Sequence, residues 1–123
     1  MPKKTIPFDF VLDYLLPLEV TIKPMFGFFA LYIGEKIVLI LRQNIKNPEK
    51  NGVWIATSQQ HHSSLKKDFP SLRSISNKSD EIIETEWQVL PEDADDFESS
   101  VIKVCELVKR GDHRIGRIPK LKK

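Results

Sequence analysis

Along the chain, the spacing of hydrophobic residues changes from that of a helix to that of strands, and later returns to that of a helix. Near the N-terminus, apolar residues recur at i, i+3, i+4, i+7 and i+8, which predicts one face of a short amphipathic helix. Pro17 should end this helix, because proline cannot continue a helical backbone. The positions of this face are Phe8, Val11, Leu12, Leu15 and Leu16.

Strand patterns follow the predicted helix. Alternating or continuous apolar residues predict strands over 20–23, 28–33, 36–42 and 53–57. Gly34-Glu35 fits a two-residue hairpin turn between the second and third of them. Pro24 cannot donate a ladder hydrogen bond, so it indicates a sheet edge, a bulge or a strand end.

The second half of the chain predicts a short helix over 62–69, a short strand over 73–76, a half-buried strand over 83–89 and a final helix beginning near Phe97. Acidic residues crowd the first turn of that final helix, and Gly111 supplies a cap at its end. Its apolar face consists of Phe97, Val101, Val104, Cys105 and Val108.

The element order α-β-β-β-β-α-β-β-α predicts an α+β fold. Consecutive strands with short connections form a mostly antiparallel sheet, here of about five to six strands, with the helices packed on one face as a second layer. We expect one domain over residues 1–110, followed by a basic C-terminal tail over 111–123.

The third predicted strand is apolar on both of its faces. Val38 and Ile40 are as apolar as the residues between which they lie, and Phe28 and Phe29 also point to opposite faces. A sheet with helices on one side only would leave the second apolar face in contact with water. We expect either a second subunit or the folded-back C-terminal tail to cover it, and a homodimer is the preferred interpretation.

The composition is that of an ordinary globular protein. Of the 123 residues, 41% are apolar and 29% charged, and one cysteine excludes an internal disulfide. No apolar run reaches the roughly 20 residues that a membrane span requires, and the N-terminus lacks the pattern of a signal peptide. These features predict a cytoplasmic protein without membrane contact.

Positive charge is concentrated at the C-terminal end. Residues 109–123 contain seven Lys or Arg and one Asp, whereas the rest of the chain is mildly acidic. Such a segment could contact nucleic-acid phosphates, although it has no aromatic residue for base stacking. The alternative is a solvated terminus. The candidate contacts are Arg114, Arg117, Lys120, Lys122 and Lys123.

No residue pattern predicts a catalytic, metal or cofactor site. His61 and His62 are adjacent and would point in different directions, and His113 is the only other histidine. The serines near them lack a nucleophile-elbow motif. Cys105 falls on the apolar face of the last helix, where we expect a buried, inert thiol.

The stretch KPMFGFFALYIGEKIVLILR, residues 23–42, resembles the N-terminal domain of the TfoX/Sxy competence-regulator family. YjbR-like domains, with a proposed DNA-binding role, are a neighbouring alternative with a similar layout. Ala30 departs from the family pattern, which often has glycine there. The resemblance implies a two-layer α+β domain and no catalytic residues, and its motif positions are Lys23, Met25, Phe26, Gly27, Tyr32 and Lys36.

We therefore expect a non-enzymatic domain with a regulatory role that acts through protein–protein contact or self-association. A nucleic-acid-binding accessory domain is the main alternative. A small ligand-binding protein or enzyme is the weaker one.

Overall fold

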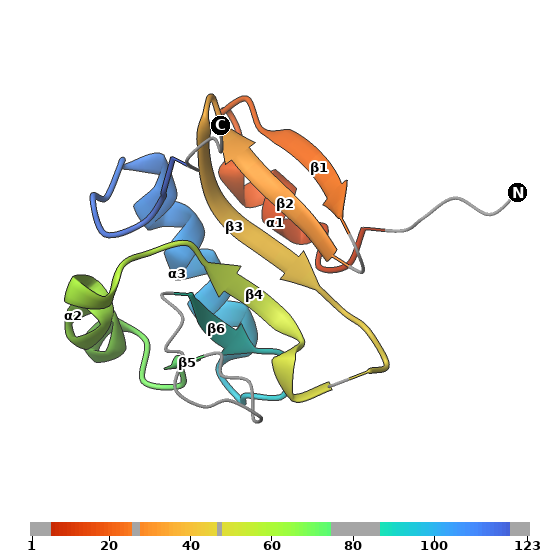
Figure 1. Ribbon diagram of the computed structural model, residues 1–123, viewed down its shortest axis with the longest axis vertical. Helices are drawn as coiled ribbons and strands as arrows, with labels where there is room; N and C mark the ends of the chain where they lie inside the picture. Colours follow the sequence, from red (N-terminus) through yellow and green to blue (C-terminus); the bar gives the residue numbers. More distant parts are fainter. Residues whose placement is uncertain (1–5, 26–27, 47, 75–86, 119–123) are drawn as a thin grey trace, which may run out of the picture.

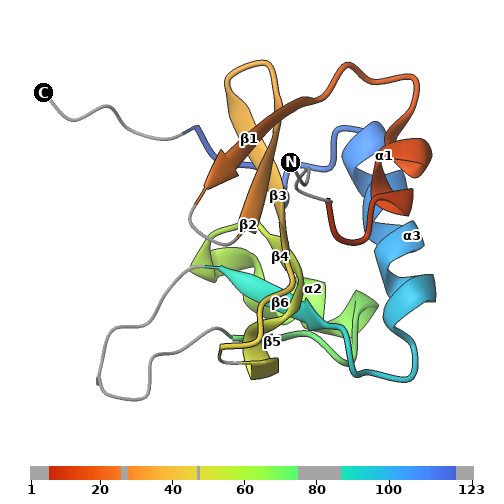
Figure 2. The same ribbon diagram turned by 90° about the vertical axis from the view of Figure 1, so that its right-hand side faces the viewer.

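Six antiparallel strands form one sheet, with helices packed on one side of it. The computed structural model describes residues 6–25, 28–46, 48–74 and 87–118. The strand order is β1-β2-β3-β4-β6-β5 (Figure 1). Helices α1 and α3 lie on the same side of the sheet, as Figure 2 shows. The predicted two-layer α+β fold is confirmed.

The helices are α1 (Phe10–Leu15), α2 (His62–Asp68) and α3 (Phe97–Lys109), with single 3-10 turns η1 (Pro48–Lys50) and η2 (Gln59–His61). The strands are β1 (Thr21–Met25), β2 (Phe28–Ile33), β3 (Lys36–Arg42), β4 (Gly52–Ile55), β5 (Arg73–Ser74) and β6 (Gln88–Pro91). The predicted bounds of β2 and β3 are confirmed. Parts of two predicted strands fall within residues 75–86, outside the described residues.

Helix α1 is shorter than its apolar pattern predicts. Leu16 was expected on the inner face, but its side chain is 60% exposed. Its backbone is extended, because a residue that precedes proline is disfavoured in the helical region. Val11 and Leu15 are fully buried, so the inner face consists of fewer positions than the sequence suggested.

Helix α3 supplies the centre of the core between the helices and the sheet. Val101, Val104 and Cys105 are fully buried against α1 and the helix-facing side of the sheet. Burial raises the pKa of the Cys105 thiol to about 12. The expectation of a core thiol is confirmed, and such a thiol stays protonated and unreactive at neutral pH.

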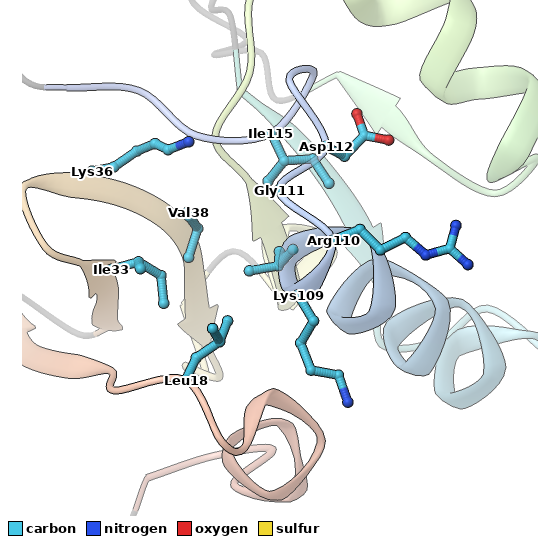
Figure 3. A pocket seen from close by; sticks show the side chains of 10 residues that line it. Leu18, Ile33, Lys36, Val38, Lys109, Arg110, Gly111, Asp112 and Ile115 are labelled. Carbon is cyan, nitrogen blue, oxygen red and sulfur yellow. The ribbon is translucent and has the colours of Figure 1, made fainter.

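Strand β3 carries a bulge. Its register with β2 pairs Leu39 with Leu31 but Ile37 with Tyr32, so Val38 is the extra residue. Val38 and Leu39 therefore both face the helices, whereas Ile37 and Ile40 face the opposite side. Val38 borders a crevice below the end of α3 (Figure 3).

The structured part of the chain extends beyond the predicted boundary at residue 110. Ile115 is buried in the main core, and the Gly116 N–H donates to the Ala56 carbonyl at 2.7 Å. Arg117 exchanges two backbone hydrogen bonds with Ile37, each of 2.9 Å. Since β4 pairs with β3 only from Leu39 onward, this segment satisfies the backbone groups of β3 that β4 leaves uncovered.

None of the helices in the described part of the chain is long and apolar enough to cross a membrane.

The close approach of β4 and β6 requires glycine at position 52. Gly52 has φ +144, and a Cβ there would overlap the Leu90 carbonyl oxygen. We expect Gly52→Ala to lower the free energy of unfolding by roughly 3 kcal/mol or more, measured by urea denaturation, because the backbone of two strands must separate.

Gly34→Ala is the matched control. Gly34 also has a positive φ, of +64, but no atom lies within 4 Å of the position that a Cβ would take there. Only the cost of the left-handed conformation remains, about 1 kcal/mol. Equal losses for the two variants would contradict the steric role of Gly52.

Candidate functional site

The three histidines do not form a metal site. The ring centroids of His61 and His113 lie 5.2 Å apart, edge to face. The His62 ring turns instead toward the Gln88 side chain, with Nδ1 and Nε2 separated by 3.3 Å. Among the described residues no three His, Cys, Asp or Glu side chains gather as metal ligands. The approach of His113 to His61 was not foreseen, because it depends on how the C-terminal segment returns to α2.

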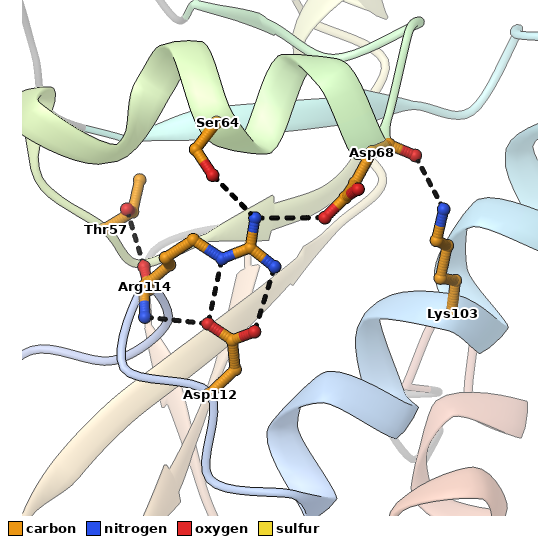
Figure 4. Close-up of polar contacts among 6 residues, drawn as sticks. All are labelled: Thr57, Ser64, Asp68, Lys103, Asp112 and Arg114. Carbon is orange, nitrogen blue, oxygen red and sulfur yellow. Dashed lines mark hydrogen bonds and ion pairs between the residues drawn. The ribbon is translucent and has the colours of Figure 1, made fainter.

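Arg114 fastens the C-terminal segment to the rest of the fold (Figure 4). Its guanidinium donates to both carboxylate oxygens of Asp112 at 2.9 Å and to Asp68 at 3.0 Å. It also donates to the Ser64 hydroxyl at 2.9 Å, and the Thr57 hydroxyl donates to the Arg114 carbonyl at 2.7 Å. We call this set of contacts the Arg114 clamp.

The charges of the Arg114 clamp stabilise each other. Hydrogen bonds from Arg114 lower the pKa of Asp112 from its ordinary 3.8 to about 2. The same contacts raise the pKa of Arg114. The guanidinium is largely buried and faces two carboxylates, so its charge is balanced within the fold. Its predicted contact with nucleic acid therefore has less physical support than the contact predicted for Arg117.

The sheet face turned away from α1 and α3 is called here the open face. Its residues form rows that run across the strands. Residues directly opposite each other on paired strands share a face, so the register defines rows across the sheet. The longest row crosses all six strands as Lys23, Ala30, Ile40, Trp54, Val89 and Arg73. A second row is Thr21, Tyr32, Ile37 and Arg117, and a third includes Phe28, Arg42, Gly52 and Pro91.

Four half-buried aromatic side chains cover buried alanine and isoleucine residues at the centre of the open face. The rings of Phe28 and Trp54 stack with centroids 6.0 Å apart, and Trp54 meets Trp87 edge to face at 6.0 Å. The Trp54 indole N–H donates to the Lys50 carbonyl, which fixes the orientation of the ring. The fourth is Tyr32, and the residues underneath are Ala30, Ile37, Ile40 and Ala56.

This aromatic cluster covers the second face of β3. Ile37 and Ile40 are 8% and 4% exposed in the single chain, because neighbouring aromatic rings shield them. They are therefore buried within the single chain, in which Arg117 of the C-terminal segment also lies beside Ile37. The aromatic rings themselves form the outer surface.

Positive charges surround the aromatic centre. Lys23, Arg73 and Arg117 are exposed at the ends of the rows. The Lys23 ammonium lies 4.7 Å from the centroid of the Tyr32 ring, in a cation–π contact. No Asp or Glu occurs among the described strand residues that form these rows. The open face is therefore aromatic at its centre and cationic at its margins.

The predicted tail residues divide into three groups. Arg114 belongs to the clamp, and Arg117 lies in a row of the open face. Lys120, Lys122 and Lys123 lie outside the described residues.

Comparison with protein-family models, with curated proteins and with solved structures finds no match. The resemblance to the TfoX/Sxy family stays a prediction. Of its motif positions, Lys23 and Tyr32 meet on the open face, and Lys36 begins β3 on the helix side. Met25 ends β1, and Phe26 and Gly27 lie outside the described residues.

The Arg114 clamp should affect how the free energy of unfolding changes with pH in the acidic range. Asp112 has a folded-state pKa near 2, so its contribution is complete above pH 4 and is lost as the pH falls toward 2. We expect Asp112→Asn to cost on the order of 1 to 2 kcal/mol at pH 7 and to lessen the fall in stability between pH 4 and 2. Urea denaturation at a series of pH values measures both effects.

Asp95→Asn, at an exposed carboxylate before α3, is the control and should leave both quantities nearly unchanged. An Asp112→Asn variant with wild-type stability at pH 7 would show that the clamp does not stabilise the fold.

Proposed function

We propose that this protein is a non-catalytic domain that binds single-stranded nucleic acid on the open face. The observation that carries the proposal is the combination of aromatic rings at the centre of this face with cations at its margins. Single strands are bound without sequence preference by such surfaces, in which bases stack on aromatic side chains and phosphates meet Lys or Arg.

The arrangement removes the main objection to nucleic-acid binding. The C-terminal segment has no aromatic residue of its own, but Arg117 lies in the same row as Tyr32. The chain then continues as Ile-Pro-Lys-Leu-Lys-Lys, so three further lysines follow Arg117 in sequence. Among the described residues, the aromatic rings and the cations of Lys23, Arg73 and Arg117 come from different parts of the chain and lie on one face.

The charge pattern disfavours a second copy of the chain as the occupant of this face. In a two-fold pair of sheets packed face to face, the cationic ends of the rows would lie against cationic ends of the other copy. An anionic partner with flat apolar groups matches the same pattern.

Both tryptophans of the chain are at the open face, so intrinsic fluorescence reports on it directly. We expect a single-stranded oligothymidylate to quench this fluorescence, because stacked bases quench indole. The affinity should fall linearly with log salt, with a slope of about −0.7 for each phosphate contact. Lys23→Glu and Arg117→Glu should each weaken binding by about tenfold and lessen the slope.

Lys67→Glu is the charge-matched control, since Lys67 is exposed on α2. Truncation after Ile118 should also weaken binding while the melting temperature stays unchanged, whereas removal from residue 111 would delete Ile115 and the clamp and destabilise the fold.

Absence of quenching at low salt, or equal weakening by Lys67→Glu and Lys23→Glu, would contradict the proposal. A fluorescence change that follows protein concentration alone, together with dimers in light scattering, would assign the open face to self-association instead.

A further inference from the structure

A second candidate site lies on the helix side of the sheet and is separate from the open face. It is a crevice of about 270 Å³ where four segments meet: the loop after α1, the β2–β3 hairpin, the end of α3 and the C-terminal segment. Figure 3 shows that its inner wall is formed by aliphatic side chains, among them Leu18, Ile33, Val38 and Ile115.

The backbone is adapted to this crevice at the bulge in β3. The bulge directs Val38 to the helix side together with Leu39, and there Val38 lines the crevice. Bulges are common where a strand re-aims a side chain toward a site.

The stem of the Lys36 side chain crosses close to Gly116 at the margin of the crevice. The side-chain stem of Lys36 lies against Gly116, where a Cβ would come within 2.6 Å of the Lys36 Cδ. Glycine at 116, with φ +114, is therefore the residue that lets the Lys36 stem cross at this point.

The margin is cationic. Lys36 from β3 and Lys109 from the end of α3 border the crevice on different sides (Figure 3). Glu106 pairs with the Lys109 ammonium only loosely, at 3.8 Å. Asp112 also lines the crevice, but its carboxylate is held by Arg114 and is balanced there.

We propose that this crevice binds a small amphiphilic carboxylate, with the hydrocarbon part against the aliphatic wall and the carboxylate at the cationic margin to which Lys36 and Lys109 belong. Apolar pockets with a few polar groups at one end bind ligands in this orientation. A dry cavity of about 150 Å³ accepts benzene, so 270 Å³ suits a chain of about eight carbons. The inference does not depend on nucleic-acid binding.

Octanoate, 1-octanol and octylammonium are the probes, used below their micelle concentrations with the full chain. In a methyl-resolved NMR titration, octanoate should shift the methyl signals of Leu18, Ile33, Val38 and Ile115. 1-Octanol should bind about tenfold more weakly, because it lacks the charge-assisted hydrogen bonds to lysine.

The double variant Lys36→Glu/Lys109→Glu should lose octanoate binding by about tenfold or more and gain affinity for octylammonium. Lys67→Glu is the charge-matched control, because Lys67 is exposed on α2 and is not among the residues that line the crevice. It should change octanoate affinity by no more than about twofold.

Three results would overturn the inference: no shift of these methyl signals at millimolar octanoate, equal affinity for 1-octanol and octanoate, or equal weakening by Lys67→Glu and the double variant. The comparison of the three probes on the unmodified protein needs no variant, so a folding defect in the double variant leaves the test intact. If the protein binds octanoate but not oligothymidylate, the result would contradict nucleic-acid binding at the open face and leave the inference about the crevice unaffected.

Discussion

Strand β3 has to be covered on both of its faces, and much of the architecture follows from that requirement. Burying each large aliphatic side chain stabilises the fold by roughly 1.5 to 3 kcal/mol, so neither face can be left in water without a large loss. The helices cover Leu39 and Leu41 on one side. Aromatic side chains from β2 and β4, together with Trp87 just before β6, cover Ile37 and Ile40 on the other side. The protein therefore has a main core between the sheet and the helices and a smaller second core, which the aromatic cluster covers.

The function proposed for the open face depends on the aromatic cluster. Rings that bury the aliphatic residues beneath them on one side present their other edges and faces outward. The Arg114 clamp and the pairing of Arg117 with Ile37 then place a cation in a row of this face. A basic residue of the terminal segment is thus positioned by the fold, and salt bridges some distance from the face determine where it lies.

Local pattern predicts much of the fold and little of the candidate site. Alternation and the Gly34 turn predict the β2–β3 hairpin, and helical spacing predicts the buried face of α3, because both signals are local in sequence. The row that joins Lys23 to Trp54 and Arg73 depends on pairing across five strand contacts, and no local pattern encodes it. The pairing of Arg114 with Asp68 is also non-local.

The bulge at Val38 is a further feature that the local sequence pattern does not predict. An unbroken run of apolar residues over 37–41 has no alternation that could reveal an extra residue. The sequence therefore predicts a doubly apolar strand but not which side chains face which layer. For that reason neither the composition of the open face nor the aliphatic wall of the crevice was predicted.

The most direct test of binding at the open face is an amide and indole NMR titration of the full chain with a single-stranded oligonucleotide. We expect shifts confined to the rows of the open face, with the Trp54 indole, Lys23 and Tyr32 among the largest. Shifts that map to α1 and α3, or an unchanged spectrum at low salt, would contradict binding at this face.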